Sequence, residues 1–242
     1  MMDIYRNVIR CIVRDVILSP IWKIGKSNML KPWMATKDEI LILELLKNKK
    51  PKKCLEWGSG YSTIYFPKYL RVDSKWISIE HDKEWFERIN QLTKPDNKIE
   101  FYHVPPNNSS WKDNSYSDGN ILDFEDYVNF PKKFHKRFDF ILIDGRARKF
   151  CLRSSIDLLE PEGIVVLHDA NVKECHEYFE LFDHQILFAD DRHDSGGLWI
   201  GSKLAKLESL LDIKKHKMVW SILARFPEPL QWSLSYRVKK RK

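Results

Sequence analysis

Two glycines two residues apart, Gly58 and Gly60, follow a short apolar run. Glycine permits a tight turn and close approach of a ligand to the backbone, and a helix that starts after such a turn offers free N–H groups to an anion. A second apolar run ends at Glu80, 22 residues beyond Gly58. A carboxylate at that position can accept hydrogen bonds from two ribose hydroxyls. Together these features predict a site for a nucleoside that carries an anionic group.

Two later apolar runs end in side chains that could accept or donate a proton. Asp144 ends one run, and His168 with Asp169 ends the next. A carboxylate or imidazole beside an acceptor hydroxyl provides a route for its proton during group transfer. Arg146 and Arg148 follow Asp144, and guanidinium groups can clamp a carboxylate or phosphate of an acceptor. An alternative interpretation is that Asp144 caps the following helix and that the arginines face the surface or solvent.

These residues form one site only if the fold brings the ends of the runs together. Short apolar runs alternate with helical patterns, which is typical of a Rossmann-like, doubly wound α/β sheet with mostly parallel strands. In such a sheet, ligands bind beyond the carboxyl ends of the strands. We expect strands at residues 52–57, 75–80, 98–104, 138–144, 163–169, 184–189 and 197–203, and helices within 59–70 and at 82–92, 147–159 and 172–182.

Helical segments also flank the alternating region. Thr36 and Glu39 have the spacing of a capping box at the start of a helix over residues 36–50. We therefore divide the chain into three parts, which are an N-terminal amphipathic helix and linker (1–35), a ligand-binding domain (36–202) and a basic helical C-terminal tail (203–242).

The order of four motifs resembles a known family. "LEWGSGYST", "ISIEHD", "FDFILIDGRAR" and "GIVVLHDA" follow one another as in the class I S-adenosylmethionine-dependent methyltransferases, and the similarity covers roughly residues 36–202. The pattern is most similar to a branch with E-[YW]-G-S-G-x-S-T and D-G-R-x-R motifs. The resemblance implies a seven-stranded methyltransferase sheet and S-adenosylmethionine as cofactor. By motif position it assigns cofactor contacts to Glu56, Gly58, Ser59, Gly60, Ser62, Thr63, Glu80 and His81.

The resemblance also implies methyl transfer to oxygen, on a small-molecule or carbohydrate acceptor. Asp144, His168 or Asp169 would then supply the base. The polar loop at 105–135 contains Trp111 and Tyr116, whose rings are suited to stacking on sugar rings in an acceptor lid. A solvated insertion with a short helix near residues 122–129 is the alternative for this loop.

Other interpretations of the site stay open. The metal-dependent catechol type has Asp-Asn after its fifth strand, whereas this chain has Asp169-Ala170 with Asn171 one place late, so a divalent metal is not favoured. The third position of a dinucleotide G-x-G-x-x-G motif is Thr63, which weakens the case for an NAD-dependent oxidoreductase. A non-catalytic nucleoside-binding module is a further alternative.

The distribution of charge bears on partners. Residues 203–242 carry eleven Lys and Arg against three Asp and Glu, whereas residues 1–202 carry thirty against thirty-one. A nearly neutral domain does not favour nucleic acid as a partner. Residues 4–18 place Arg6, Arg10 and Arg14 on one stripe of an amphipathic helix, and with the basic tail they could meet an anionic membrane surface.

The cysteines and the N-terminal sequence bear on location. The four cysteines are widely spaced and suggest neither a disulfide framework nor a zinc site. The three arginines also interrupt any signal-peptide core. We expect a cytoplasmic protein, peripheral on the inner face of a membrane if the termini bind lipid; the oligomeric state is left open.

Overall fold

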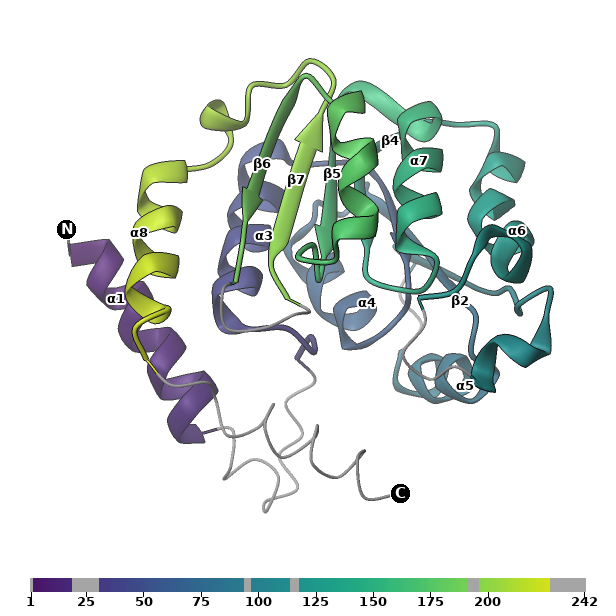
Figure 1. The fold of residues 1–242 in the computed structure, drawn as a ribbon, viewed down its shortest axis with the longest axis horizontal. Coiled ribbons are helices and arrows are strands. Elements are labelled where there is room, and N and C mark those ends of the chain that lie inside the picture. The colour runs from purple at the N-terminus through teal and green to yellow at the C-terminus, as the bar shows by residue number, and fades with distance from the viewer. Residues whose placement is uncertain (1, 19–30, 94–96, 114–117, 191–195, 227–242) are drawn as a thin grey trace.

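The computed structural model describes residues 2–18, 31–93, 97–113, 118–190 and 196–226. It shows a seven-stranded sheet with helices on both faces, in the strand order β3-β2-β1-β4-β5-β7-β6 (Figure 1). The first five strands pair in parallel, and β7 runs antiparallel between β5 and β6. This confirms the predicted mostly parallel, doubly wound sheet. The strands are β1 (Lys53–Trp57), β2 (Lys75–Glu80), β3 (Ile99–His103), β4 (Phe138–Ile143), β5 (Leu159–His168), β6 (His184–Phe188) and β7 (Leu198–Ser202).

The central strands are buried on both faces, which explains their continuous apolar sequences. Leu55 and Trp57 of β1 face the core on one side of the sheet, and Cys54 faces the core on the other. The helices of the domain are α3 (Thr36–Lys49), α4 (Tyr61–Tyr65), α5 (Lys83–Leu92), α6 (Ile121–Asn129) and α7 (Arg148–Leu158), with short 3-10 segments η2 (Phe66–Tyr69), η3 (Ser109–Asp113), η4 (Phe130–Phe134) and η6 (Leu207–Ser209).

One predicted helix has a different geometry. The sequence predicts an α-helix over residues 172–182, but the segment forms a 3-10 helix, η5 (Lys173–Leu181). Three residues per turn place positions i and i+3 in line, and the rings of His176 and Phe179 stack there with centroids 4.7 Å apart. Phe179 stacks in turn on Trp199 of β7 at 4.5 Å. The tighter 3-10 geometry thus accompanies the stacking of His176 on Phe179 and of Phe179 on Trp199.

The N-terminal helix is joined to the domain by polar contacts. Helix α1 (Met2–Cys11) continues as a π-helical segment, η1 (Ile12–Leu18). The predicted capping box at Thr36 and Glu39 is wrong, because Ala35 occupies the N-cap position of α3. Asp15 of η1 accepts hydrogen bonds from the backbone N–H of Thr36, at 2.9 Å, and from its hydroxyl. Glu39 instead pairs with the buried Arg14.

The two terminal helices pack on each other. Val8 and Cys11 of α1 form a small apolar core with Val219 and Leu223 of α8 (Ile213–Leu223). Figure 1 shows the two helices side by side at one edge of the molecule. No helix among the described residues is both long and apolar enough to cross a membrane. The division into parts at residues 35 and 202 stays a prediction.

Candidate active site

The glycine turn after β1 lies directly against the turn after β4. Gly58 has a φ of +89°, and a Cβ atom there would lie 2.3 Å from the Cα of Gly145. Only glycine fits this contact, since a side chain would meet backbone and the left-handed conformation disfavours one. At Gly60, by contrast, the nearest atom to an added Cβ is 3.6 Å away. The crossing of the two turns therefore fixes the loop at Gly58, whereas an added Cβ at Gly60 would make only an ordinary van der Waals contact.

Glu56 lies beneath this loop and is completely buried. Its carboxylate accepts hydrogen bonds from four side chains, at 2.6 Å from Ser62, 2.7 Å from Thr63, 2.9 Å from Trp76 and 2.7 Å from Ser78. Burial raises the pKa of Glu56 to about 7, against the opposing effect of these donors. The predicted cofactor contact of Glu56 needs correction, because its carboxylate is enclosed by protein and supports the loop from below.

Glu80 at the end of β2 fixes the loop from the side. It is 2% exposed, and one of its oxygens accepts from the backbone N–H of Ser59 at 2.8 Å. The other accepts from the N–H groups of His81 and Asp82, at 2.9 and 2.8 Å. The His81 Nδ1 also lies 2.8 Å from that oxygen, Oε1, so the acceptor position that remains for a ligand hydroxyl is on Oε2. Glu80 thus sits where the resemblance places the ribose, but the backbone already holds it.

Sequence reasoning missed Trp85, which holds the same loop from outside. Its indole Nε1–H donates to the carbonyl oxygen of Ser59 at 2.7 Å. The rings of Trp33 and Tyr61 pack on Trp85 with centroids 5.3 and 6.0 Å away. The position of Trp85, in the first turn of the helix after Glu80, was the only signal that could have found it.

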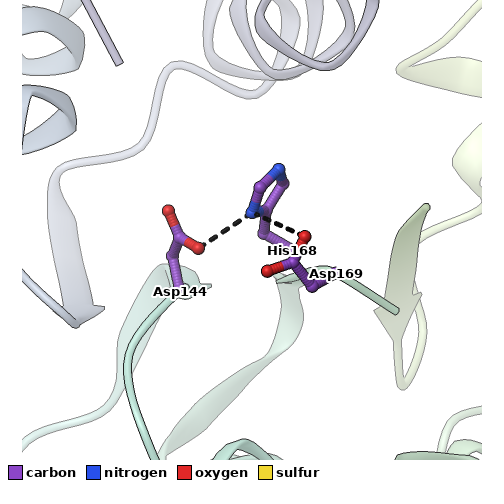
Figure 2. A group of neighbouring side chains, drawn as sticks. All are labelled: Asp144, His168 and Asp169. Carbon is purple, nitrogen blue, oxygen red and sulfur yellow. Dashed lines mark hydrogen bonds and ion pairs between the residues drawn. The ribbon is translucent and has the colours of Figure 1, made fainter. Parts of the chain in front are cut away.

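His168 lies between the carboxylates of three aspartates. Its Nδ1 lies 2.8 Å from Oδ1 of Asp144 and 3.7 Å from Oδ1 of Asp169 (Figure 2). On the other side of the ring, Nε2 lies 3.6 Å from Oδ2 of Asp38. Asp144 and Asp169 meet because β4 and β5 are neighbouring parallel strands, and a φ of +57° at Asp169 turns the chain at that point. Asp38, from the first turn of α3, was not found from the sequence.

The carboxylates around His168 raise its pKa and favour its protonated form. Burial on its own would lower the pKa of this imidazole, but Asp144, Asp169 and Asp38 raise it well above its usual value. The three carboxylates therefore favour the imidazolium form of the ring, in which both nitrogens are donors. An imidazolium has no lone pair to accept a proton. In that form His168 could not act as the base, whereas Asp144 and Asp169 could; the role of each of the three residues stays a prediction.

Arg148 is engaged by protein carboxylates. Its guanidinium lies 3.0 Å from Oδ1 of Asp118 and 3.1 Å from Oδ2 of Asp169, and these acids raise its pKa against the opposing effect of burial. Asp118 also accepts from the backbone N–H of Arg148 at 2.6 Å. Ala147 occupies the N-cap position of α7, so Asp144 does not cap this helix. The predicted clamp of Arg148 on an acceptor therefore needs correction, because the side chain orients Asp169.

Of the two aromatic residues predicted for an acceptor lid, the structure describes Trp111. The Arg146 guanidinium lies 5.7 Å from the ring centroid of Trp111, which also packs on His81 at 5.2 Å and on Phe124 at 5.0 Å. Trp111 and His81 thus belong to one aromatic cluster beside the end of β2. Tyr116 lies outside the described residues. The short helix expected near 122–129 is present as α6.

Among the described residues, Asp144, His168 and Asp169 form one group whose possible ligand atoms all lie within 4.8 Å of one another. A divalent ion held by this group would need His168 in its neutral form, because metal binding displaces the imidazole proton. Asn171 is held elsewhere, since its amide donates to the carbonyl oxygen of Asp190 at 2.7 Å.

Comparison with known proteins agrees with this architecture. No protein-family model matches the chain, and no curated protein matches it. A methyltransferase-like protein from Silicibacter pomeroyi shares 16% identity with a TM-score of 0.50, over 78% of this chain and 97% of that one. The chain has the Rossmann-like fold of methyltransferases.

Two further solved structures are similar to the chain. Human methyltransferase-like protein 13, in complex with SAH, has a TM-score of 0.49 and 15% identity over 78% of this chain and 92% of that one. The O-methyltransferase TomG from Streptomyces achromogenes, in complex with SAM, has a TM-score of 0.46 and 17% identity over 74% of this chain and 84% of that one.

Proposed function

We propose that this chain is an S-adenosylmethionine-dependent methyltransferase that methylates a hydroxyl of a small-molecule or carbohydrate acceptor. The observation that carries the proposal is the pair of carboxylates, Asp144 and Asp169, at the ends of neighbouring strands. The backbone N–H of Asp144 donates to the carbonyl oxygen of Trp57 at 2.8 Å, so the pair lies beside the glycine loop. A nucleophile and a cofactor bound at this edge would meet there.

The cofactor would lie along the loop from Gly58 to Gly60. Glu80 would then offer its remaining acceptor position to a ribose hydroxyl, and the backbone from Gly58 to Gly60 would hold the methionine part. Glu56 and Trp85 keep the loop in place from below and outside. The bound cofactor supplies the methyl group as a sulfonium.

The protein's own task in the reaction is to receive the acceptor's proton. With the cofactor bound, Asp144 or Asp169 would accept the proton that the acceptor hydroxyl loses as its oxygen is methylated. His168 and Arg148 hold these two carboxylates in position. The proposal uses no divalent metal, and EDTA should therefore leave turnover unchanged.

Calorimetry tests cofactor binding. We expect S-adenosylmethionine and S-adenosylhomocysteine to bind and NAD not to bind. Glu80→Gln should weaken binding by about 1.5–3 kcal/mol, the range of hydrogen bonds to a charged group. Glu100→Gln, on the neighbouring strand β3, is the matched control and should bind like the parent. Binding of NAD in place of S-adenosylhomocysteine would favour an oxidoreductase.

Release of S-adenosylhomocysteine, measured over a panel of hydroxylated acceptors, tests catalysis. Asp144→Asn or Asp169→Asn should lower kcat by about 10²–10⁴, the range for loss of a general base, with nearly unchanged cofactor affinity. Asp157→Asn, an exposed carboxylate of α7, is the control. If S-adenosylhomocysteine binds but no acceptor supports turnover, the chain is a nucleoside-binding module.

A further inference from the structure

The outer face of α1 exposes an apolar stripe. Met2, Tyr5, Ile9 and Val13 are 88%, 59%, 59% and 36% exposed, and they recur at helical spacing from α1 into η1. The inner face of the same helix is also apolar and packs on α8. Apolar residues scattered singly on a surface are ordinary, whereas a continuous stripe on a helix that already has a buried face indicates a second contact.

Basic residues accompany this stripe. Arg6 and Arg10 are exposed on α1, and Lys214, Lys217 and Arg225 are exposed on or just beyond the adjacent α8. The exposed acids of the same two helices are Asp3 and Asp212. Met218 and Phe226 add apolar surface, with exposures of 51% and 42%.

A lipid membrane matches both properties of this face, because it has an apolar interior and can have anionic headgroups. An interfacial helix has a large apolar face flanked by Lys and Arg, and it lies in the plane of the headgroups. Each basic residue close to an anionic membrane strengthens binding by about fivefold. Tyr5 is suited to such a position, because its ring is apolar and its hydroxyl is polar.

We propose that the outer face of α1 is a docking surface for an anionic lipid membrane. Met2, Tyr5, Ile9 and Val13 enter the headgroup region, and Arg6 contacts acidic lipid. The half-exposed Arg10 lies at the edge of this surface, with its guanidinium 3.5 Å from Glu39 of the domain. This differs from docking through the whole arginine stripe, because Arg14 is buried against Glu39 and faces the domain. The proposal is independent of methyl transfer.

The test is co-sedimentation of the full chain with vesicles of phosphatidylcholine alone and of phosphatidylcholine mixed with phosphatidylglycerol. We expect binding to the anionic vesicles only, weakened by salt. The double variant Tyr5→Gln/Ile9→Gln should reduce partitioning about tenfold or more, and Arg6→Gln should reduce it about fivefold.

The controls are matched in exposure and chemistry. Val72→Gln/Leu122→Gln removes two similarly exposed apolar side chains elsewhere, and Arg153→Gln removes an exposed arginine of α7. These variants should bind like the parent, and circular dichroism should be the same for all. Failure of the parent to bind either vesicle type overturns the proposal, as does equal binding by the parent and the Tyr5/Ile9 variant. It is also overturned if light scattering shows a dimer that this variant converts to a monomer without any vesicle binding, since a second copy would then cover the face.

Discussion

Glu56 provides a sharp test of how the glycine loop is supported. Its pKa rises from 4.5 to about 7 in the folded protein, because burial outweighs the four donors around it. A tenfold change in proton affinity corresponds to about 1.4 kcal/mol, so the rise in pKa is worth about 3 kcal/mol. In the window between these two pKa values the folded state binds more protons than the unfolded state. The stability associated with Glu56 is therefore complete below pH 4.5 and is lost as the pH rises to about 7.

Replacing Glu56 with glutamine removes this titration. Glutamine resembles the protonated acid, so the variant and the parent should have similar free energies of unfolding near the lower end of the window. Above its upper end, the parent should have lost up to about 3 kcal/mol that the variant keeps. Urea unfolding across the window measures this difference. Glu100→Gln, a less buried carboxylate on β3, should give a curve parallel to that of the parent.

The result that would refute this reasoning is a constant difference between the Glu56→Gln variant and the parent at every pH. Such a result would mean that the four donors keep Glu56 ionised throughout. A second observable separates the support of the loop from ligand contact. If Glu56 only supports the loop, the affinity for S-adenosylhomocysteine should follow loop stability and be almost unchanged at the lower end of the window.

Three further substitutions probe neighbouring contacts. Asp38→Asn should lower the pKa of His168, as followed by NMR of the ring protons, because a nearby carboxylate favours the imidazolium; no change would mean that the 3.6 Å contact carries little energy. Gly145→Ala should destabilise the fold by about 1–3 kcal/mol in urea unfolding, since the new Cβ would lie 2.2 Å from the Tyr127 hydroxyl, and adding Tyr127→Phe should restore part of the loss. Trp85→Phe should weaken S-adenosylhomocysteine about fivefold in calorimetry, as one hydrogen bond to the glycine loop is lost.

The sheet could be predicted because its signals are local. Each strand is a short apolar run, and runs separated by helices pair in parallel. That rule also places Asp144 and Asp169 side by side, although they are distant in the sequence. The 3-10 geometry of η5 could not be predicted, since it accompanies the stacking of Phe179 on Trp199 of another element. Local periodicity carries no information about such a contact.

The protein contacts of the candidate site residues were harder to predict than the positions of those residues at the strand ends. A glutamate before a glycine turn suggests a ligand contact, and only the packing shows that Glu56 is enclosed by four protein donors. Similarly, the position of Arg148 after Asp144 suggests a guanidinium that is free to bind an acceptor. In the structure it pairs instead with Asp118, which is distant in the sequence. In both cases a group that could bind a ligand is engaged by residues that only the tertiary structure brings near.

The first turn of α3 shows why this happens and what it implies. Four consecutive polar residues, of a kind normally exposed, are all buried here, which is tolerable only because each has a partner. Thr36, Lys37, Asp38 and Glu39 pair in turn with Asp15, Asp190, His168 and Arg14. These partners come from the N-terminal helix, the segment after β6 and the end of β5. The same turn thus connects the N-terminal helix to the imidazolium between the two candidate bases.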